Sequence, residues 1–152
     1  MVYVNGVSVI GPGLTDTLVT QAVLRGERQW QYEELHALKP AMLPANERRR
    51  TTTLIKLALQ AMQDLLREYD NLNTVASVFA SSDGDLGIVD KLCRALASDD
   101  KIVSPTVFHN SVHNAPAGYW SIAASLRGAS TSLSAGCQFH GRSDGGDDQG
   151  HE

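Results

Sequence analysis

The sequence is poor in cysteine, in long apolar runs and in net charge, and each shortage excludes a class of protein. Its two cysteines, Cys93 and Cys137, cannot form a disulfide framework, so reduced thiols and a cytoplasmic location are expected. No apolar run approaches the roughly 20 residues that cross a bilayer, and the first residues lack the basic and apolar regions of a signal peptide. The net charge of -4 does not favour nucleic acid as a partner, and the one basic run, Arg48–Arg50, is too short to follow a phosphate backbone.

What the sequence does contain is enough apolar material for one core. The chain has 152 residues, of which 42% are hydrophobic, and this fits a single domain without internal repeats. Runs of β-branched and small residues predict strands near 2–10, 74–80 and 130–135, the first with a possible hairpin at Asn5-Gly6. Helical patterns lie between these runs. The alternation predicts an α/β fold with a largely parallel sheet between helix layers.

The clearest helical pattern covers residues 46–69. Leu54, Ala58, Ala61 and Leu65 recur at helical spacing, and Asn46 is placed to cap the start. Arg48, Arg49 and Arg50 would then lie in the first turns, where the helix dipole disfavours cations. The run is interpreted either as solvated surface charge or as a docking patch for an acidic partner.

Three further helices are predicted. Residues 14–25 form a short helix with Thr15 as the cap, and Asp85 caps a helix in which Cys93 is a buried structural thiol. The third helix is expected around 117–126, after a capped turn at Ser104-Pro105. Between strand and helix, "SSDGDLG" has glycines but fits no phosphate-loop pattern.

Two candidate sites rest on histidine. His109 and His113 are four residues apart and could share a helix face as metal ligands, but HExxH is absent and no carboxylate lies nearby, so hydrogen-bonded histidines are the alternative. Cys137 with either histidine would be a nucleophilic pair. A helix start would lower the thiol pKa, but the glycine-rich sequence after Cys137 cannot sustain a helix. No metal site or cofactor is predicted.

Four motifs together carry a family resemblance: "RRRTTTLIKLALQAM", "SVFASSDGDLGIVDKLCRALA", "SPTVFHNSVHNAPAGYWSIA" and "GASTSLSAG". Their order resembles the N-terminal half of the β-ketoacyl synthase-like proteins. "FASSDGDLG" and "SVHNAPAGYWSI" resemble the chain-length-factor-like branch of aryl-polyene and xanthomonadin-type pigment pathways. The resemblance covers residues 1–136. It implies a layered thiolase-like fold, of which this chain would hold the N-terminal half only, and condensation of acyl chains carried on acyl carrier protein.

The resemblance also implies that the catalytic residues are missing. Active synthases end the strand equivalent to "TSLSAG" in Thr-Ala-Cys, and here Ser134-Ala135-Gly136 occupies those places. Gly136 therefore stands at the nucleophile position, and Cys137 falls one residue late, which turns a side chain by about 100° at a helix start. The family's catalytic histidines lie in its C-terminal half, and His109 and His113 do not match them.

The expected function is a non-catalytic synthase-like subunit that shapes the acyl tunnel or stabilises a catalytic ketoacyl synthase. Its expected partners are that synthase and acyl carrier protein. Arg48, Arg49, Arg50, Tyr119 and Trp120 are the candidate interface residues, although a core role for Trp120 is equally open. The alternatives are an active 3-oxoacyl-[acyl-carrier-protein] synthase that uses Cys137, and a non-functional truncated fragment.

The last segment, 137–152, is expected to be an out-of-frame or disordered tail. Codons can be chosen for it such that reading one base later gives Ala-Ser-Phe-Thr-Ala-Gly-Leu-Met-Glu-Ala-Met-Ile-Lys-Gly. In that frame apolar residues fall at helical spacing and glycine closes the helix. A solvated Gly/Asp tail would thus replace an amphipathic helix.

Overall fold

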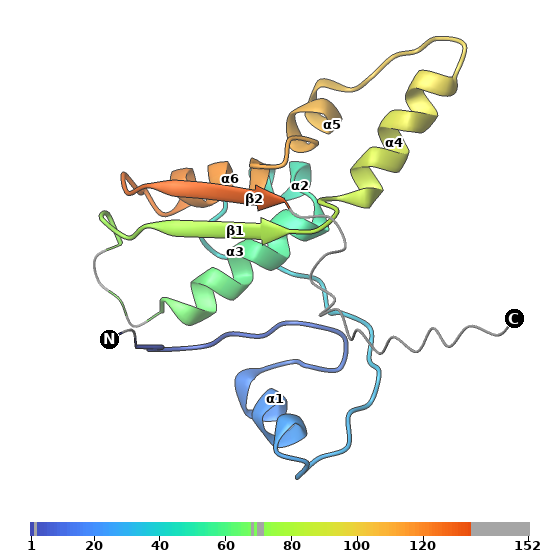
Figure 1. Cartoon of the computed structure of the whole chain (residues 1–152). Coiled ribbons are helices and arrows are strands. Elements are labelled where there is room, and N and C mark those ends of the chain that lie inside the picture. The colour runs from blue at the N-terminus through green and yellow to red at the C-terminus, as the bar shows by residue number, and fades with distance from the viewer. Residues whose placement is uncertain (2, 68, 70–71, 135–152) are drawn as a thin grey trace, which may run out of the picture.

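A computed structural model describes residues 1, 3–67, 69 and 72–134 of the chain (Figure 1). The predictions for Gly136, Cys137 and the 137–152 segment lie outside these residues. The element order is α1 (Thr17–Leu24), α2 (Ala45–Arg50), α3 (Thr53–Leu65), β1 (Ser77–Ser81), α4 (Leu86–Ala97), α5 (Pro105–Asn110), α6 (Ala115–Ala123) and β2 (Ser130–Ser134). Within this described part, every helix is too short or too polar to cross a membrane.

The two strands lie side by side and run in the same direction. Ser77 pairs with Ser130 and Ser81 with Ser134, so the register contains no offset along the strands. At the start of the pair, the Ser77 hydroxyl donates to the Ser130 hydroxyl at 3.1 Å. The predicted strands near 74–80 and 130–135 are confirmed over the residues described, and so are the parallel direction of the sheet and the mixture of helix and strand.

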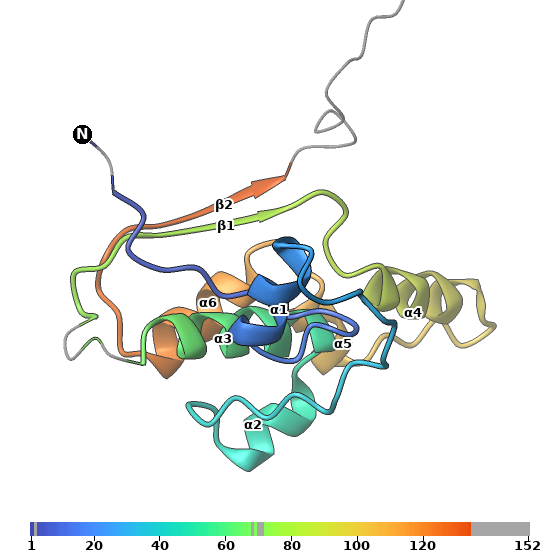
Figure 2. The ribbon, with the colours of Figure 1, turned by 90° about the horizontal axis from the view of Figure 1, so that it is seen from below.

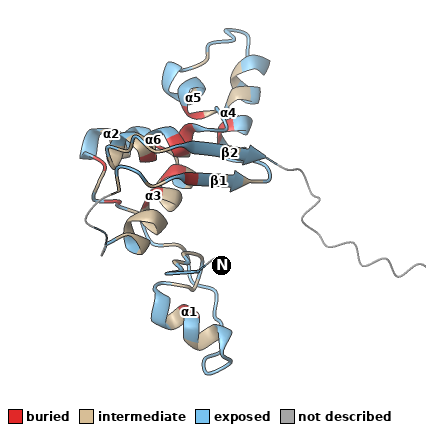
Figure 3. Cartoon of the chain, turned by 60° about the vertical axis from the view of Figure 1, so that its left-hand side comes forward, coloured by how far each residue is buried: buried red, intermediate tan, exposed pale blue. Residues whose placement is uncertain are grey.

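The core lies between α3, α6 and one face of this sheet. Ile55 and Leu59 of α3 and Trp120 of α6 are almost completely buried, and Leu43 and Ala115 join them. Figure 3 shows the buried residues concentrated where these elements meet. Removing one such large apolar side chain from water contributes roughly 1.5–3 kcal/mol, so this contact holds the helices to the sheet.

The opposite face of the sheet is exposed. Figure 2 shows the strands along one side of the molecule with the helices on the other side. Side chains alternate along a strand, so Phe79 points toward the core while Val78 points outward. Val78 is 67% exposed and Leu133 is 52% exposed. Parallel sheets normally have both faces covered, so this bare face is unusual for the pairing that the strands adopt.

The prediction of one helix over 46–69 was wrong, because two helices meet there. α2 ends at Arg50, and Thr52 caps α3 by accepting the Ile55 N–H at 3.3 Å. Asn46 lies inside α2 and is not a cap. Thr51 and Thr52 are extended, a conformation that β-branched residues readily adopt. The arginines consequently occupy the last turn of α2, where the helix dipole favours cations.

The predicted strand and hairpin near residues 2–10 are absent from residues 3–10. The segment instead passes the end of α3, where the backbone of Gly6 lies beside the Leu65 side chain. The local turn is at Pro12-Gly13, closed by a bridge between Gly11 and Leu14. A strand needs a neighbour for its backbone donors and acceptors, and neither β1 nor β2 pairs with this segment.

Smaller differences concern caps and burial. Asp16 caps α1 by accepting the Val19 N–H at 2.9 Å, whereas Thr15 does not cap it. α6 begins at Ala115, earlier than predicted, because Pro116 suits the first turn of a helix. The cap at Asp85 is confirmed. Cys93 is exposed, which corrects its assignment as a buried thiol, since α4 extends away from the core (Figure 1).

Candidate functional site

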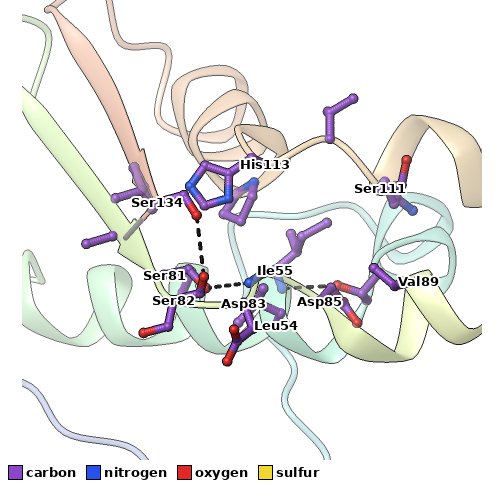
Figure 4. A pocket seen from close by; sticks show the side chains of 18 residues that line it. Leu54, Ile55, Ser81, Ser82, Asp83, Asp85, Val89, Ser111, His113 and Ser134 are labelled. Atoms are coloured by element: carbon purple, nitrogen blue, oxygen red, sulfur yellow. Dashed lines mark hydrogen bonds between the residues drawn. The ribbon is translucent and has the colours of Figure 1, made fainter. Parts of the chain in front are cut away.

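The candidate site is a cavity of about 310 Å³ at the carboxyl ends of β1 and β2. Parallel strands present their carboxyl ends at one edge of a sheet, where α/β proteins commonly bind ligands. Helices α3, α4, α5 and α6 and the turn after β1 complete the walls. Figure 4 shows side chains from these elements converging on one space.

The turn after β1 forms the polar rim. Gly84 has φ +65°, a conformation that favours glycine, and its N–H donates to the Ser81 hydroxyl at 3.0 Å. The Ser134 hydroxyl, at the end of β2, donates to the Ser82 carbonyl at 3.4 Å. Asp85 then accepts the Ile88 N–H and starts α4. The turn therefore fixes the ends of both strands relative to α4 (Figure 4).

His113 lies above this turn, between α5 and α6. Its Nε2 lies 2.8 Å from the Leu133 carbonyl oxygen, so the neutral tautomer that protonates Nε2 donates to β2. Within the described chain, the ring nitrogens make no hydrogen bond to a hydroxyl or carboxylate that would orient them for proton transfer. His113 is thus placed to tie the α5–α6 turn to the sheet.

The remaining wall of the cavity is apolar. It is formed by side chains that point inward from α3, β1 and α4 and from the start of α6, namely Leu54, Ile55, Ala58, Phe79, Val89 and Pro116. A cavity with an apolar wall and a polar rim suits an amphipathic ligand such as an acyl group with a polar end. The described lining residues contain serines, carboxylates and one imidazole, but no hydrogen-bonded nucleophile–base pair.

The predicted interface arginines do not share one environment. Arg48 is partly buried and its Nη1 donates to the Pro40 carbonyl at 3.4 Å. Arg49 and Arg50 are exposed, and among the described residues neither forms an ion pair. Arg49 and Arg50 are therefore available to a partner, whereas Arg48 has a structural contact.

The two predicted aromatic interface residues, Tyr119 and Trp120, differ in how far they are buried. Trp120 is 0% exposed and lies in the core, so of the two roles left open for it, core and interface, the structure favours the core. Tyr119 is partly buried, and its hydroxyl donates to Asn110 Oδ1 at 3.2 Å. Burial raises the pKa of Tyr119 above 10.0, and the nearby Glu47 carboxylate adds to the rise.

Asn110 is a structural residue that sequence reasoning missed. It is buried at the end of α5, and its Nδ2 donates to the Arg50 carbonyl at 2.7 Å. With the bond from Tyr119, the side chain connects α2, α5 and α6. The only signal in the sequence was its repetition with Asn114 beside the two histidines.

The two histidines have separate partners. His109 lies in α5, and its ring packs edge-on against Tyr119 with centroids 6.1 Å apart. α5 ends at Asn110, so His113 does not follow on the same helix and the proposed shared face does not form. Among the described residues, no three potential metal ligands lie together.

Comparisons with known proteins agree with this arrangement of motifs. The family model described as "Beta-ketoacyl synthase, N-terminal domain" matches residues 24–140. A chain of the solved "Ketosynthase (ApeO) in Complex with its Chain Length Factor (ApeC) from Xenorhabdus doucetiae" is 28% identical, with a TM-score of 0.68. The match covers 87% of the present chain and 56% of that chain, so this chain spans little more than half of the solved one. No curated protein matches the sequence.

The family match includes the elements that build the cavity, from α3 through β2. The solved ketosynthase complex supports the same relationship at the level of structure. The resemblance seen in the four sequence motifs is therefore confirmed. The chain belongs to the β-ketoacyl synthase N-terminal domain family.

Proposed function

We propose that this chain is a chain-length-factor-like subunit that does not itself catalyse condensation and acts with a catalytic ketoacyl synthase in acyl chain elongation. The observation that carries the proposal is a cavity whose apolar wall can hold an acyl chain but whose described polar groups form no nucleophile–base pair. In the sequence, Gly136 stands where the family resemblance places the nucleophile.

The exposed sheet face supports the need for a partner. Val78 and Leu133 are apolar, exposed and on the same face of a parallel pair. In the layered thiolase-like arrangement that we propose, a further layer covers this face. The solved relative is a ketosynthase in complex with its chain length factor, and a synthase partner for this chain is proposed by analogy.

An acyl carrier protein is the second proposed partner. Arg49 and Arg50 are exposed cations at the end of α2, close to the α3 wall of the cavity. An acidic carrier would be attracted to them, and that attraction would weaken as salt screens the charges. The proposed docking surface is thus Arg49, Arg50 and the exposed part of Tyr119.

A second candidate, an active synthase that uses Cys137, rests on one observation. Ser134 lines the cavity, and Cys137 follows it by three positions in the sequence. This candidate requires Cys137 to react with acyl groups. Labelling of the thiol by cerulenin, abolished in Cys137→Ala, would favour it over the non-condensing subunit.

Co-expression with a family synthase, followed by size-exclusion chromatography, tests the proposal. We expect a stable complex of the two chains that binds an acidic carrier protein. Arg49→Ala with Arg50→Ala should weaken carrier binding, and the loss should be larger at low salt. Arg94→Ala is the matched control, because Arg94 is an exposed arginine already paired with Asp90 at 2.8 Å. Failure of the chains to associate would contradict the proposal.

A further inference from the structure

We infer that a second cleft, formed where α2, α3, α4 and α5 meet, binds a phosphate-bearing small molecule. The cleft has a volume of about 340 Å³. Four cationic side chains line it: Arg49 and Arg50 from α2, Lys56 from α3 and Lys91 from α4. Its single lining carboxylate is Asp85, which is engaged with the Ile88 N–H at 3.2 Å. The cleft therefore carries a local excess of positive charge.

These cations are not neutralised within the described chain. The ion pairs there are Arg67 with Asp64 and Arg94 with Asp90, and neither includes a cleft residue. Like charges gathered around one concave space repel each other, and an anion bound among them would relieve that repulsion. A protein with a net charge of -4 places these four cations together despite its acidic balance.

Neutral donors and helix ends add to the same field. Thr53 and Thr106 contribute side-chain hydroxyl groups to the lining, whereas the hydroxyl of Thr51, a third lining threonine, already donates to the Arg48 carbonyl at 3.1 Å. α3, of 13 residues, begins at Thr53, and the first turn of α4 lines the opposite wall. The amino ends of helices carry partial positive charge, which adds to the attraction of the side chains for an anion.

The shape and donor set favour a phosphate over a protein carboxylate. Arginine guanidinium groups bind phosphate oxygens through two parallel N–H bonds, and lysines and hydroxyls can serve the remaining oxygens. The volume accommodates a phosphorylated small molecule, whereas a carboxylate on a folded acidic surface would meet mainly the exposed arginines. Lys56 and Lys91 thus gain a role that carrier docking does not use.

Calorimetric titration of the full chain with inorganic pyrophosphate tests the inference. We expect saturable binding of one pyrophosphate per chain. Lys91→Ala should weaken the affinity about tenfold, because it removes a charge-assisted contact. Arg94→Ala is the control, since Arg94 lies on the same helix as Lys91 but outside the cleft. Lys91 is exposed, so its variant should keep the circular dichroism spectrum of the parent chain.

A second variant and a second ligand complete the test. Arg49→Ala should weaken binding to a similar extent as Lys91→Ala. Tighter binding of adenosine monophosphate than of inorganic phosphate would indicate a nucleotide source, and equal binding would indicate recognition of the phosphate alone; both support the site. Absence of saturable binding, or equal weakening by Lys91→Ala and Arg94→Ala, would overturn it.

Discussion

Asn110 shows how one buried polar residue fixes three helices. Its amide nitrogen donates to the Arg50 carbonyl at the end of α2, and its oxygen accepts from the Tyr119 hydroxyl on α6. Both contacts lie where solvent cannot easily replace them, since Asn110 is 4% exposed. The side chain therefore links the arginine run to the helix that carries Trp120.

Replacement of this residue should destabilise the fold. Asn110→Ala leaves the Arg50 carbonyl and the Tyr119 hydroxyl without their partner, and we expect a loss of about 1–3 kcal/mol in the free energy of unfolding. Urea denaturation followed by circular dichroism measures it. Asn114→Ala is the matched control, because Asn114 is exposed and makes no side-chain cap contact. Equal losses for the two variants would contradict the linking role.

The phenol of Tyr119 should make stability depend on alkaline pH. Burial raises its pKa in the folded chain above 10.0, so the folded state holds the proton more tightly than the unfolded state. The contribution is complete below about pH 10 and is lost as the pH rises through the folded pKa. We expect the free energy of unfolding of Tyr119→Phe to fall less than that of the parent chain when the pH is raised from neutral to above about 10. Urea unfolding of both chains at neutral and at alkaline pH measures the two losses. Equal losses for the two chains would contradict this expectation.

Single residues also mark the limit of what the sequence could predict. The Asp85 cap could be predicted, because a carboxylate just before an apolar helical pattern has one local role. The burial of Trp120 and the exposure of Cys93 could not, since both lie on helices with apolar neighbours. Burial there depends on which helices approach, and helical spacing does not contain that information.

At the scale of elements, the break between α2 and α3 decides where the arginines lie. Thr52 ends an extended pair of residues and caps α3, so the helix starts anew there. The sequence contained the signal, because residues 46–53 include three consecutive threonines and no apolar residue, and the apolar period begins only at Leu54. The prediction of a strand near 2–10 was wrong for another reason. The residue pattern there is typical of a strand, but neither β1 nor β2 pairs with this segment.

Loss of the cap should weaken α3 locally. Thr52→Ala removes the acceptor for the Ile55 N–H, and we expect a loss of about 0.5–2 kcal/mol in unfolding free energy. Thr53→Ala tests the specificity, because Thr53 is exposed and has no capping role. Thermal unfolding of both variants measures the difference. A larger effect at Thr53 would show that the helix is not capped as described.

At the scale of the whole molecule, the described residues cover one face of the sheet and leave the other exposed. The strands β1 and β2 could be predicted from their sequence patterns, because β-branched residues favour strands, but those patterns do not tell which strands pair. Only one part of the candidate cavity, the turn after β1, could be predicted from the sequence. The turn after β1 was evident from its serines and glycine, but the approach of His113 depends on how α5 and α6 fold back toward β2.

The bare face should be a binding surface and not a source of stability. Val78→Ser with Leu133→Ser removes apolar side chains that are already exposed, so we expect the unfolding free energy to change by no more than about 0.5 kcal/mol. Association with the proposed synthase partner should weaken at least about tenfold, because apolar contact area is lost. Leu24→Ser is the control, since Leu24 is 79% exposed on α1. Unchanged association would contradict this role.

Acyl elongation by a catalytic synthase, measured with and without this chain, tests the proposed function most directly. We expect no condensation by this chain alone, since the proposed function assigns Gly136 to the position that the nucleophile takes in active synthases. Added to the synthase, the chain should raise the yield or change the length of the products, and Cys137→Ala should behave like the parent chain. Elongation by the chain alone, abolished by Cys137→Ala, would contradict the account.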